Sequence, residues 1–337
     1  MTVQAPLFEK AKASEYNRAG IDFRRPMPRP KVRGLVIDFH CHLLARRHAE
    51  AWFEAADHYG IDCFLSMTPF EEVVDLLRDY GRRVHFIAVP KFRDDSPRWV
   101  EDWLSRLEMF YNLGSRIMKF HAAPQTMLYR GHWLDDPIMK PLFREAVDRK
   151  IAIMTHIGDP NTWYRGKYLD TAKYGSREDH YRMWEGLLNE YRGTPWVGAH
   201  MGGNPEDLPR LQSLLDRFPD LMLDCSATRW MVREISAQRD AAREFFIRNQ
   251  DRIIFGSDQV SGDDRSFDFL ASRFWAHRKM WETAYIGPTP IFDPDLSEEQ
   301  QPILKGLALP DEVIQKLYHN NAVNLLDKIG MPVNGWG

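Results

Sequence analysis

The chain has 337 residues, 44% of them hydrophobic, and its 45 Lys and Arg residues nearly balance its 48 Asp and Glu residues. This length allows one large domain or two ordinary ones, with ample apolar material for a core. A net charge of −3 without a basic stripe argues against nucleic-acid binding. The N-terminus lacks an apolar signal segment and no stretch approaches about 18 uncharged apolar residues, so we expect a cytoplasmic protein that does not associate with a membrane.

The first 34 residues contain prolines at positions 26, 28 and 30, which exclude a helix and a central strand there. We predict an extended N-terminal arm over residues 1–34, which lies over the following domain or contacts a partner. Residues 35–337 are expected to form one domain. Cys41, Cys63 and Cys225 each fall within an expected strand rather than in a spaced framework, so no disulfide is expected.

After the arm, eight apolar strands alternate with helical segments. The expected strands cover residues 35–42, 63–67, 84–89, 116–121, 151–156, 196–200, 221–226 and 252–257. The expected helices cover residues 45–59, 70–79, 97–111, 137–149, 178–191, 207–218, 241–249 and 311–326. This alternation predicts parallel βα units, and eight of them close a (β/α)₈ TIM barrel. An open doubly wound sheet is the alternative, but no glycine-rich phosphate loop follows the first strand.

The first strand ends in two histidines separated by one residue. In an extended strand alternate side chains share a face, so Asp38, His40 and His42 are expected on one side and Phe39 and Cys41 on the other. Two imidazoles then point into one cavity. Neutral imidazole nitrogens in that arrangement suit Zn²⁺ and its neighbours in the first transition row.

Polar side chains gather at the ends of the other strands, where a TIM barrel places its active site. They are Lys119 and His121 at the end of strand four, His156 at the end of strand five, His200 at the end of strand six and Asp258 directly after strand eight. His40, His42, His156 and Asp258 supply three imidazoles and a carboxylate, which leaves a metal position open for water. His200 is then free to act as a general base.

Five motifs in order resemble the amidohydrolase-related proteins of the second group. They are the Asp-Phe-His-Cys-His end of the first strand, Met-Thr-His at 154–156, Gly-Ala-His-Met-Gly-Gly at 198–203, Phe-Gly-Ser-Asp at 255–258, and the closing segments 309–313 and 318–326. This branch of the amidohydrolase superfamily includes aminocarboxymuconate-semialdehyde decarboxylase and its relatives. The resemblance spans roughly residues 34–327.

The resemblance implies a TIM barrel with one divalent metal, usually zinc. It implies His40, His42, His156 and Asp258 as metal ligands and His200 as the catalytic base. Lys119 lies where two-metal members of the superfamily carry a carboxylated lysine, so a binuclear site bridged by Lys119 stays open, as does Mn²⁺. In the one-metal arrangement Lys119 contacts the substrate or pairs with Asp258.

The long segment 158–179 is expected to be a loop without secondary structure, and such loops are often lids or binding loops. Its aromatic and cationic residues, including Trp163 and Arg165, suggest a clamp for an aromatic or carboxylated ligand. A contact between subunits is the alternative, and we expect a homodimer. Arg229, just after strand seven, is the best candidate to grip a substrate carboxylate, because its planar fork matches one bidentately; a surface arginine is the alternative.

Two reactions fit these residues. The first is hydrolysis of an amide, ester or lactone of a small, carboxylated substrate by zinc-activated water, with His200 or Asp258 moving the proton. The second is non-oxidative decarboxylation of an unsaturated or aromatic carboxylic acid. Sequence leaves both open, because the difference lies in how the substrate is oriented over one metal centre. A catalytically silent ligand-binding barrel predicts defects among these residues, and we find none.

Overall fold

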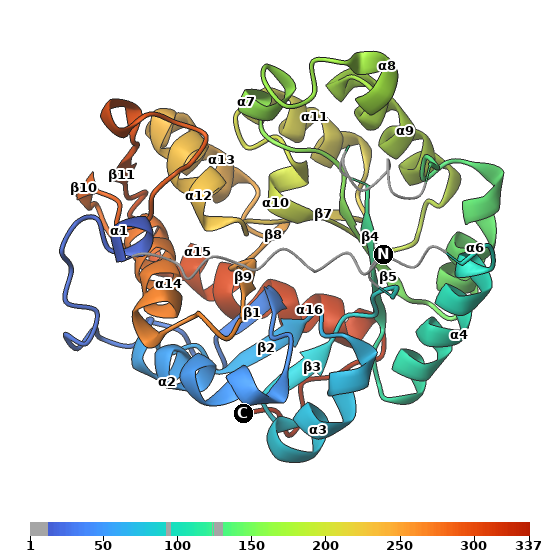
Figure 1. Cartoon of the computed structure of the whole chain (residues 1–337), viewed down its shortest axis with the longest axis horizontal. Helices are drawn as coiled ribbons and strands as arrows, with labels where there is room; N and C mark the ends of the chain where they lie inside the picture. The colour runs from blue at the N-terminus through green and yellow to red at the C-terminus, as the bar shows by residue number, and fades with distance from the viewer. Residues whose placement is uncertain (1–12, 92–95, 123, 125–130) are drawn as a thin grey trace, which may run out of the picture.

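The computed structural model describes residues 13–91, 96–122, 124 and 131–337. Eight short parallel strands form a barrel inside a ring of helices (Figure 1). The strands are β1 (Ile37–His42), β2 (Cys63–Ser66), β3 (Val84–Phe86), β4 (Ile117–His121), β5 (Ala152–His156), β6 (Trp196–Gly198), β7 (Leu221–Asp224) and β8 (Ile253–Ile254). A short strand, β9 (Gln259–Val260), adds to the edge of β1 beyond β8.

Backbone hydrogen bonds close the barrel at its two seams. The strands form two sheets, in the orders β3-β2-β1-β9 and β4-β5-β6-β7-β8. At one seam Ala88 donates its N–H to the carbonyl of Ile117 at 2.8 Å, and at the other Phe39 donates to the carbonyl of Phe255 at 2.9 Å. The (β/α)₈ barrel predicted from the alternation of elements is therefore confirmed.

The outer helices agree with the predicted segments to within a few residues. They are α2 (Ala49–Tyr59), α3 (Phe70–Tyr80), α4 (Trp99–Asn112), α6 (Lys140–Asp148), α9 (Arg177–Glu190), α11 (Leu208–Arg217) and α13 (Arg239–Arg248). The exception is α14 (Phe267–Glu282), which was not among the expected helices. The predicted last helix is divided into α15 (Asp311–Gln315), a π-helical turn (Lys316–Asn320) and α16 (Asn321–Lys328). No helix in the described ranges is long and apolar enough to cross a membrane.

The barrel interior follows the two-residue alternation of the strands. Ile117, Ala152 and Met154 belong to one buried cluster. Leu325 and Leu326 of α16 join this cluster at the end of the barrel where the strands begin. Their neighbours in sequence pack outward, against the helices. Because Lys119 follows Ile117 by two residues and His156 follows Met154 by two, both side chains continue the inward face toward the C-terminal end of the barrel.

Strand β1 departs from the simple alternation. Asp38 is paired with Phe64 and Cys41 with Ser66, so β1 carries one residue more than β2 between these pairs. Such a bulge re-aims the side chains around it. The expectation that Phe39 and Cys41 share one face, opposite Asp38 and the two histidines, is wrong: Phe39 belongs to the cluster inside the barrel and Cys41 to the outer one. Asp38 accepts hydrogen bonds from the backbone and hydroxyl of Ser257, at 2.9 and 2.5 Å.

Two segments outside the barrel lie near its C-terminal rim. The segment expected to be a structureless loop contains α7 (Asn161–Tyr164) and α8 (Thr171–Tyr174), so that expectation is wrong. Its aspartate at position 170 caps α8, a local signal that the composition of the segment concealed. Residues 286–305 include a hairpin of β10 (Ile286–Pro288) and β11 (Ile303–Lys305).

The described part of the N-terminal arm, which was expected to lack helices, contains one short helix, α1 (Ala13–Tyr16), ahead of its prolines. Residues 17–34 form no helix or strand and pack on the barrel's outer helices. Phe23 is buried, and its carbonyl accepts a hydrogen bond from Tyr59 of α2 at 3.1 Å. Arg29 pairs with Asp62 at 2.8 Å. Residues 1–12 lie outside the described residues, and the domain boundary after residue 34 stays a prediction.

Candidate metal centre

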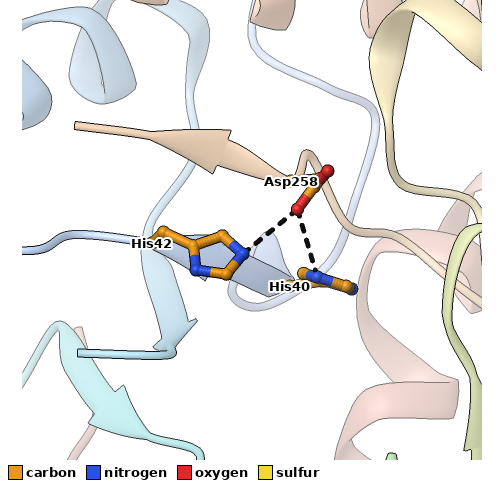
Figure 2. Close-up of side chains that lie close together, drawn as sticks. All are labelled: His40, His42 and Asp258. Atoms are coloured by element: carbon orange, nitrogen blue, oxygen red, sulfur yellow. Dashed lines mark hydrogen bonds and ion pairs between the residues drawn. The ribbon is translucent and has the colours of Figure 1, made fainter. Parts of the chain in front are cut away.

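Two histidines of β1 converge on one carboxylate oxygen. Nε2 of His40 lies 3.2 Å and Nε2 of His42 lies 3.1 Å from Oδ1 of Asp258 (Figure 2). The ligand atoms of these three residues lie within 4.8 Å of one another. A second group with this property, within the described ranges, is His40, His200 and Asp224. The structure thus brings together three of the four ligands that the family resemblance implies.

Backbone strain accompanies Asp258. Its φ is +55°, a left-handed value that costs an L residue of order 1–3 kcal/mol unless the surroundings enforce it. The N–H of Asp258 donates to the carbonyl of His40 at 2.7 Å, which fixes the turn against β1. Gly256 allows this approach, since a Cβ there would lie 2.7 Å from Cβ of His40. The turn after β8 is therefore shaped to bring its carboxylate to the two histidines.

Asp224 holds the other side of His40, and sequence reasoning missed it. Its Oδ2 accepts a hydrogen bond from Nδ1 of His40 at 2.8 Å, and its Oδ1 accepts one from the N–H of His200 at 2.9 Å. Burial opposes ionisation, yet the charge and hydrogen bond of His40 hold the pKa of Asp224 well below its usual value. The available signal was an acidic residue at the end of an apolar strand, where a carboxylate must have a partner.

The arrangement around His40 requires a positive charge. Because Nδ1 donates to Asp224, a neutral His40 turns the lone pair of Nε2 toward an oxygen of Asp258. Burial lowers the pKa of His40, but Asp224 and Asp258 outweigh this effect and raise it. His40 also helps to hold the pKa of Asp258 well below its usual value, against the effect of burial. A divalent cation bound by these atoms would supply that charge, so the donor set fits a metal.

His200 stands beside this group on an unusual turn. His200, Met201, Gly202 and Gly203 all have φ between +54° and +67°, which forms a left-handed turn after β6. Gly203 is required there, because a Cβ would lie 2.2 Å from the carbonyl oxygen of Gly158. The cost of the strained histidine is typical of residues held in place for function.

The ring of His200 is oriented by Ser226. Nδ1 of His200 donates to the Ser226 hydroxyl at 2.8 Å, and that hydroxyl donates to Asp224. Because Nδ1 carries the proton in this pair of hydrogen bonds, Nε2 of His200 has no proton when the ring is neutral. Burial, together with His156 and His40, lowers the pKa of His200 well below 6.5, although Asp258 opposes the shift. His200 is therefore a neutral imidazole with a bare nitrogen at neutral pH.

His156 does not join either group of ligand atoms within the described ranges. Its ring centre lies 4.6 Å from that of His200 and 6.1 Å from that of His121. Its Nε2 lies 3.0 Å from Oδ1 of Asp159, in the loop after β5. The structure therefore places His156 at the site with one nitrogen engaged by a carboxylate.

Lys119 is the most unusual side chain of the centre. It is fully buried, and its Nζ has no hydrogen-bond partner among the described residues. Burial lowers its pKa to about 8, while Asp224 and Asp258 oppose that shift. An ammonium without a partner is costly to bury, so Lys119 lowers the stability of the fold. Such a cost is typical of residues kept for function.

The predicted substrate-binding residues of the rim lie at different depths. Trp230, which was not predicted, has its ring centre 5.4 Å from His200 and 6.0 Å from His156. Trp163 packs behind it at 5.7 Å and donates its indole N–H to Asp295 at 2.5 Å. Arg165 and Arg229 are both exposed. Trp163 thus packs behind Trp230 and supports the wall of the site, whereas Trp230 itself contacts the histidines.

Solved structures share the fold at low sequence identity. An uncharacterized TIM-barrel protein from Bordetella bronchiseptica is 16% identical, with a TM-score of 0.53 and coverage of 88% of this chain and 100% of that one. A probable 2-pyrone-4,6-dicarboxylic acid hydrolase from Acinetobacter baumannii, with citric acid bound, is 12% identical, with a TM-score of 0.52 and coverage of 87% and 100%.

A third structure contains a metal. The 5-carboxyvanillate decarboxylase from Novosphingobium aromaticivorans, complexed with manganese and 4-hydroxy-3-methoxy-5-nitrobenzoic acid, is 13% identical, with a TM-score of 0.51 and coverage of 89% and 99%. No curated protein matches the sequence significantly. A family model described as Amidohydrolase matches residues 37–328, which span every strand of the barrel and the ligand groups at its mouth. The chain therefore belongs to the amidohydrolase family, as its strand-end motifs predict.

Proposed function

We propose that this chain is a metal-dependent hydrolase that cleaves an amide, ester or lactone bond of a small, carboxylated substrate with a zinc-activated water. The observation that carries the proposal is the neutral His200, whose bare Nε2 stands beside the group formed by His40, His42 and Asp258. Hydrolysis needs a base that removes a proton from water, and a neutral imidazole is such a base at pH 7.

His40, His42 and Asp258 would hold the metal, with His156 as the proposed fourth ligand. A divalent cation supplies Lewis acidity and lowers the pKa of a bound water toward about 7. Zinc suits imidazole and carboxylate ligands, and the manganese of the decarboxylase relative makes Mn²⁺ the alternative. A second metal bridged by a carboxylated Lys119 is the binuclear alternative.

The chain's own residues supply the proton transfers. Nε2 of His200 accepts the proton of the attacking water, while Ser226 and Asp224 keep the proton of Nδ1 in place. The imidazolium then donates its Nε2 proton to the leaving group. Asp258, ionised at neutral pH, is a second group that can carry the proton. A general acid–base group of this kind typically contributes a factor of roughly 10²–10⁴ in rate.

The substrate is expected to carry a carboxylate. The Lys119 ammonium has no partner among the described residues and can donate to a substrate oxygen at the metal centre. Arg229 lies next to Trp230 on the rim, where its fork can take a carboxylate. Arg165, which directly follows α7, is proposed to complete the substrate clamp, and Trp163 of α7 supports its wall. A cytoplasmic homodimer remains our expectation for the assembled protein.

Decarboxylation of an unsaturated or aromatic acid is the second candidate. Lys119 favours it, because a buried amine with a pKa of about 8 is largely protonated at neutral pH and can still release its proton. That proton would be delivered to the carbon that loses carbon dioxide. In this reaction His200 would bind the substrate rather than activate water.

Isotope labelling separates the two reactions. Zinc-loaded and manganese-loaded protein is screened against carboxylated lactones, esters and amides and against aromatic acids. Hydrolysis in ¹⁸O water places ¹⁸O in the product, whereas decarboxylation in D₂O places deuterium on carbon and releases carbon dioxide. The hydrolase proposal expects the first result, abolished in metal-free protein. Carbon dioxide release would replace it with the second candidate, and tight metal and ligand binding without turnover would favour a silent barrel.

A further inference from the structure

The loop after β5 carries a buried carboxylate that the proposed mechanism does not use. Asp159 is 2% exposed, and its Oδ1 lies 3.0 Å from Nε2 of His156. Its Oδ2 accepts a hydrogen bond from the Tyr168 hydroxyl at 2.7 Å. Since burying a carboxylate is costly unless its oxygens have donors, both partners are needed for Asp159 to remain at this position.

Arg177 fixes the backbone on which Asp159 stands. Its Nη2 donates to the Asp159 carbonyl at 2.5 Å, and its Nη1 donates to the carbonyl of Gly203 at 3.1 Å. It also pairs with Glu206 at 3.1 Å. Arg177 thereby ties the loop after β5 to the left-handed turn that carries His200. Arg177, one of the cationic residues of the segment 158–179, is therefore part of the scaffold.

The contact with Asp159 determines which nitrogen of His156 carries the proton. A carboxylate only accepts, so Nε2 carries the hydrogen and Nδ1 keeps its lone pair. His40 is held in the opposite sense, because Asp224 engages its Nδ1 and Nε2 faces Asp258. The two histidines therefore present different ring atoms.

We infer that Asp159 is a positioning residue for His156, which it holds through Nε2 so that Nδ1 is the atom offered to the metal centre. The inference rests on the proposed metal site and names the atom that His156 contributes. Histidine ligands generally donate their other N–H to a carboxylate or carbonyl, and losing that partner typically lowers metal affinity by about 10–100-fold.

The test compares zinc binding by variants of one loop. Apoprotein is titrated with Zn²⁺ in competition with a chromophoric chelator. Asp159→Ala should weaken binding by about 10–100-fold, and Asp159→Asn, which keeps an acceptor but loses the charge, should weaken it less. Tyr168→Phe should also weaken it, because Asp159 loses one of its donors. Asp170→Asn is the matched control, since that exposed carboxylate caps α8 and should leave affinity unchanged.

A second readout reports the ring itself. In metal-free protein labelled with ¹⁵N-histidine, NMR should show His156 with its proton on Nε2, and Asp159→Ala should change that tautomer. Wild-type affinity together with a wild-type tautomer in Asp159→Ala overturns the inference. If Asp159→Ala fails to fold by circular dichroism, Asp159→Asn carries the same test. Failure of the unaltered protein to bind zinc would instead contradict the proposed function.

Discussion

Nδ1 of His40 lies 2.8 Å from Oδ2 of Asp224, and both side chains are essentially inaccessible to water. One carboxylate therefore orients His40, the proposed metal ligand, and, through Ser226 and the N–H of His200, the proposed base as well. Asp224→Asn should lower zinc affinity by about 10–100-fold, because the amide cannot hold His40 with the same charge. Competition titration checks this. Asp220→Asn is the control, since Asp220 pairs with Lys328 at the surface; equal effects of both changes would contradict the role of Asp224.

His40→Ala and Asp258→Ala should each remove most of the bound metal and all activity. The fold should remain, because the barrel core supplies the stability of a domain this large. Elemental analysis after purification without chelator, together with circular dichroism, measures both quantities. Metal at nearly full occupancy in both variants would eliminate these residues as ligands.

His200→Ala should keep the metal and lose a factor of roughly 10²–10⁴ in kcat, as expected for a missing general base. Its imidazole accepts a proton at Nε2, and no ligand atom is lost in the one-metal arrangement. Metal content and turnover are measured on the same preparation. Loss of half the metal would point to two metals, with His200 as a ligand and Lys119 as the bridge.

Lys119→Met should stabilise the metal-free protein at neutral pH. Burial lowers the lysine pKa from 10.5 to about 8, so the unfolded chain binds more protons than the folded one between these values. Stability should therefore rise with pH from about 8 to about 10.5 in the wild type, by an upper limit of roughly 3 kcal/mol. Urea unfolding across this range should show that the variant lacks the rise. Identical pH profiles would mean that Lys119 is solvated.

Arg229→Lys should weaken substrate binding although the charge remains, because a compact ammonium does not match a planar carboxylate. Arg229→Ala should reduce kcat/KM by more than about tenfold. Steady-state kinetics on the substrate found in the screen measures both. Arg165→Ala is the comparison, since Arg165 is also an exposed arginine, directly after α7. An unchanged kcat/KM in Arg229→Ala would leave that arginine as surface.

The sequence predicted the barrel well because each strand is a short apolar run bounded by helix signals. Helix α2, for example, ends at Gly60, which adopts the left-handed conformation that stops a helix. The strand ends were less accurate: β6 stops at Gly198, because the following residues turn into the left-handed conformation. The pattern of apolar residues does not predict a left-handed conformation at His200 and Met201.

The candidate site was predicted from residue types at strand ends. The residues that this prediction missed belong to no recognisable motif. His40, His42 and Asp258 followed from their spacing and strand ends, and the structure brings them together. Asp224 and Trp230 escaped because each resembles an ordinary strand or helix residue until its neighbours from other strands are placed around it. The bulge in β1 escaped for the same reason, since register is a property of two strands.

The closure of the barrel floor by α16 bears on the order in which the chain can fold during synthesis. Leu325 and Leu326 complete a cluster whose members include residues of β1, β2, β4, β5, β6 and β8. A nascent chain that ends before Asn321 has all eight strands. Without α16, however, the inward apolar side chains are still exposed to water at the end of the barrel where the strands begin. Ribosome-bound intermediates of this length are therefore exposed to aggregation until the last helix emerges.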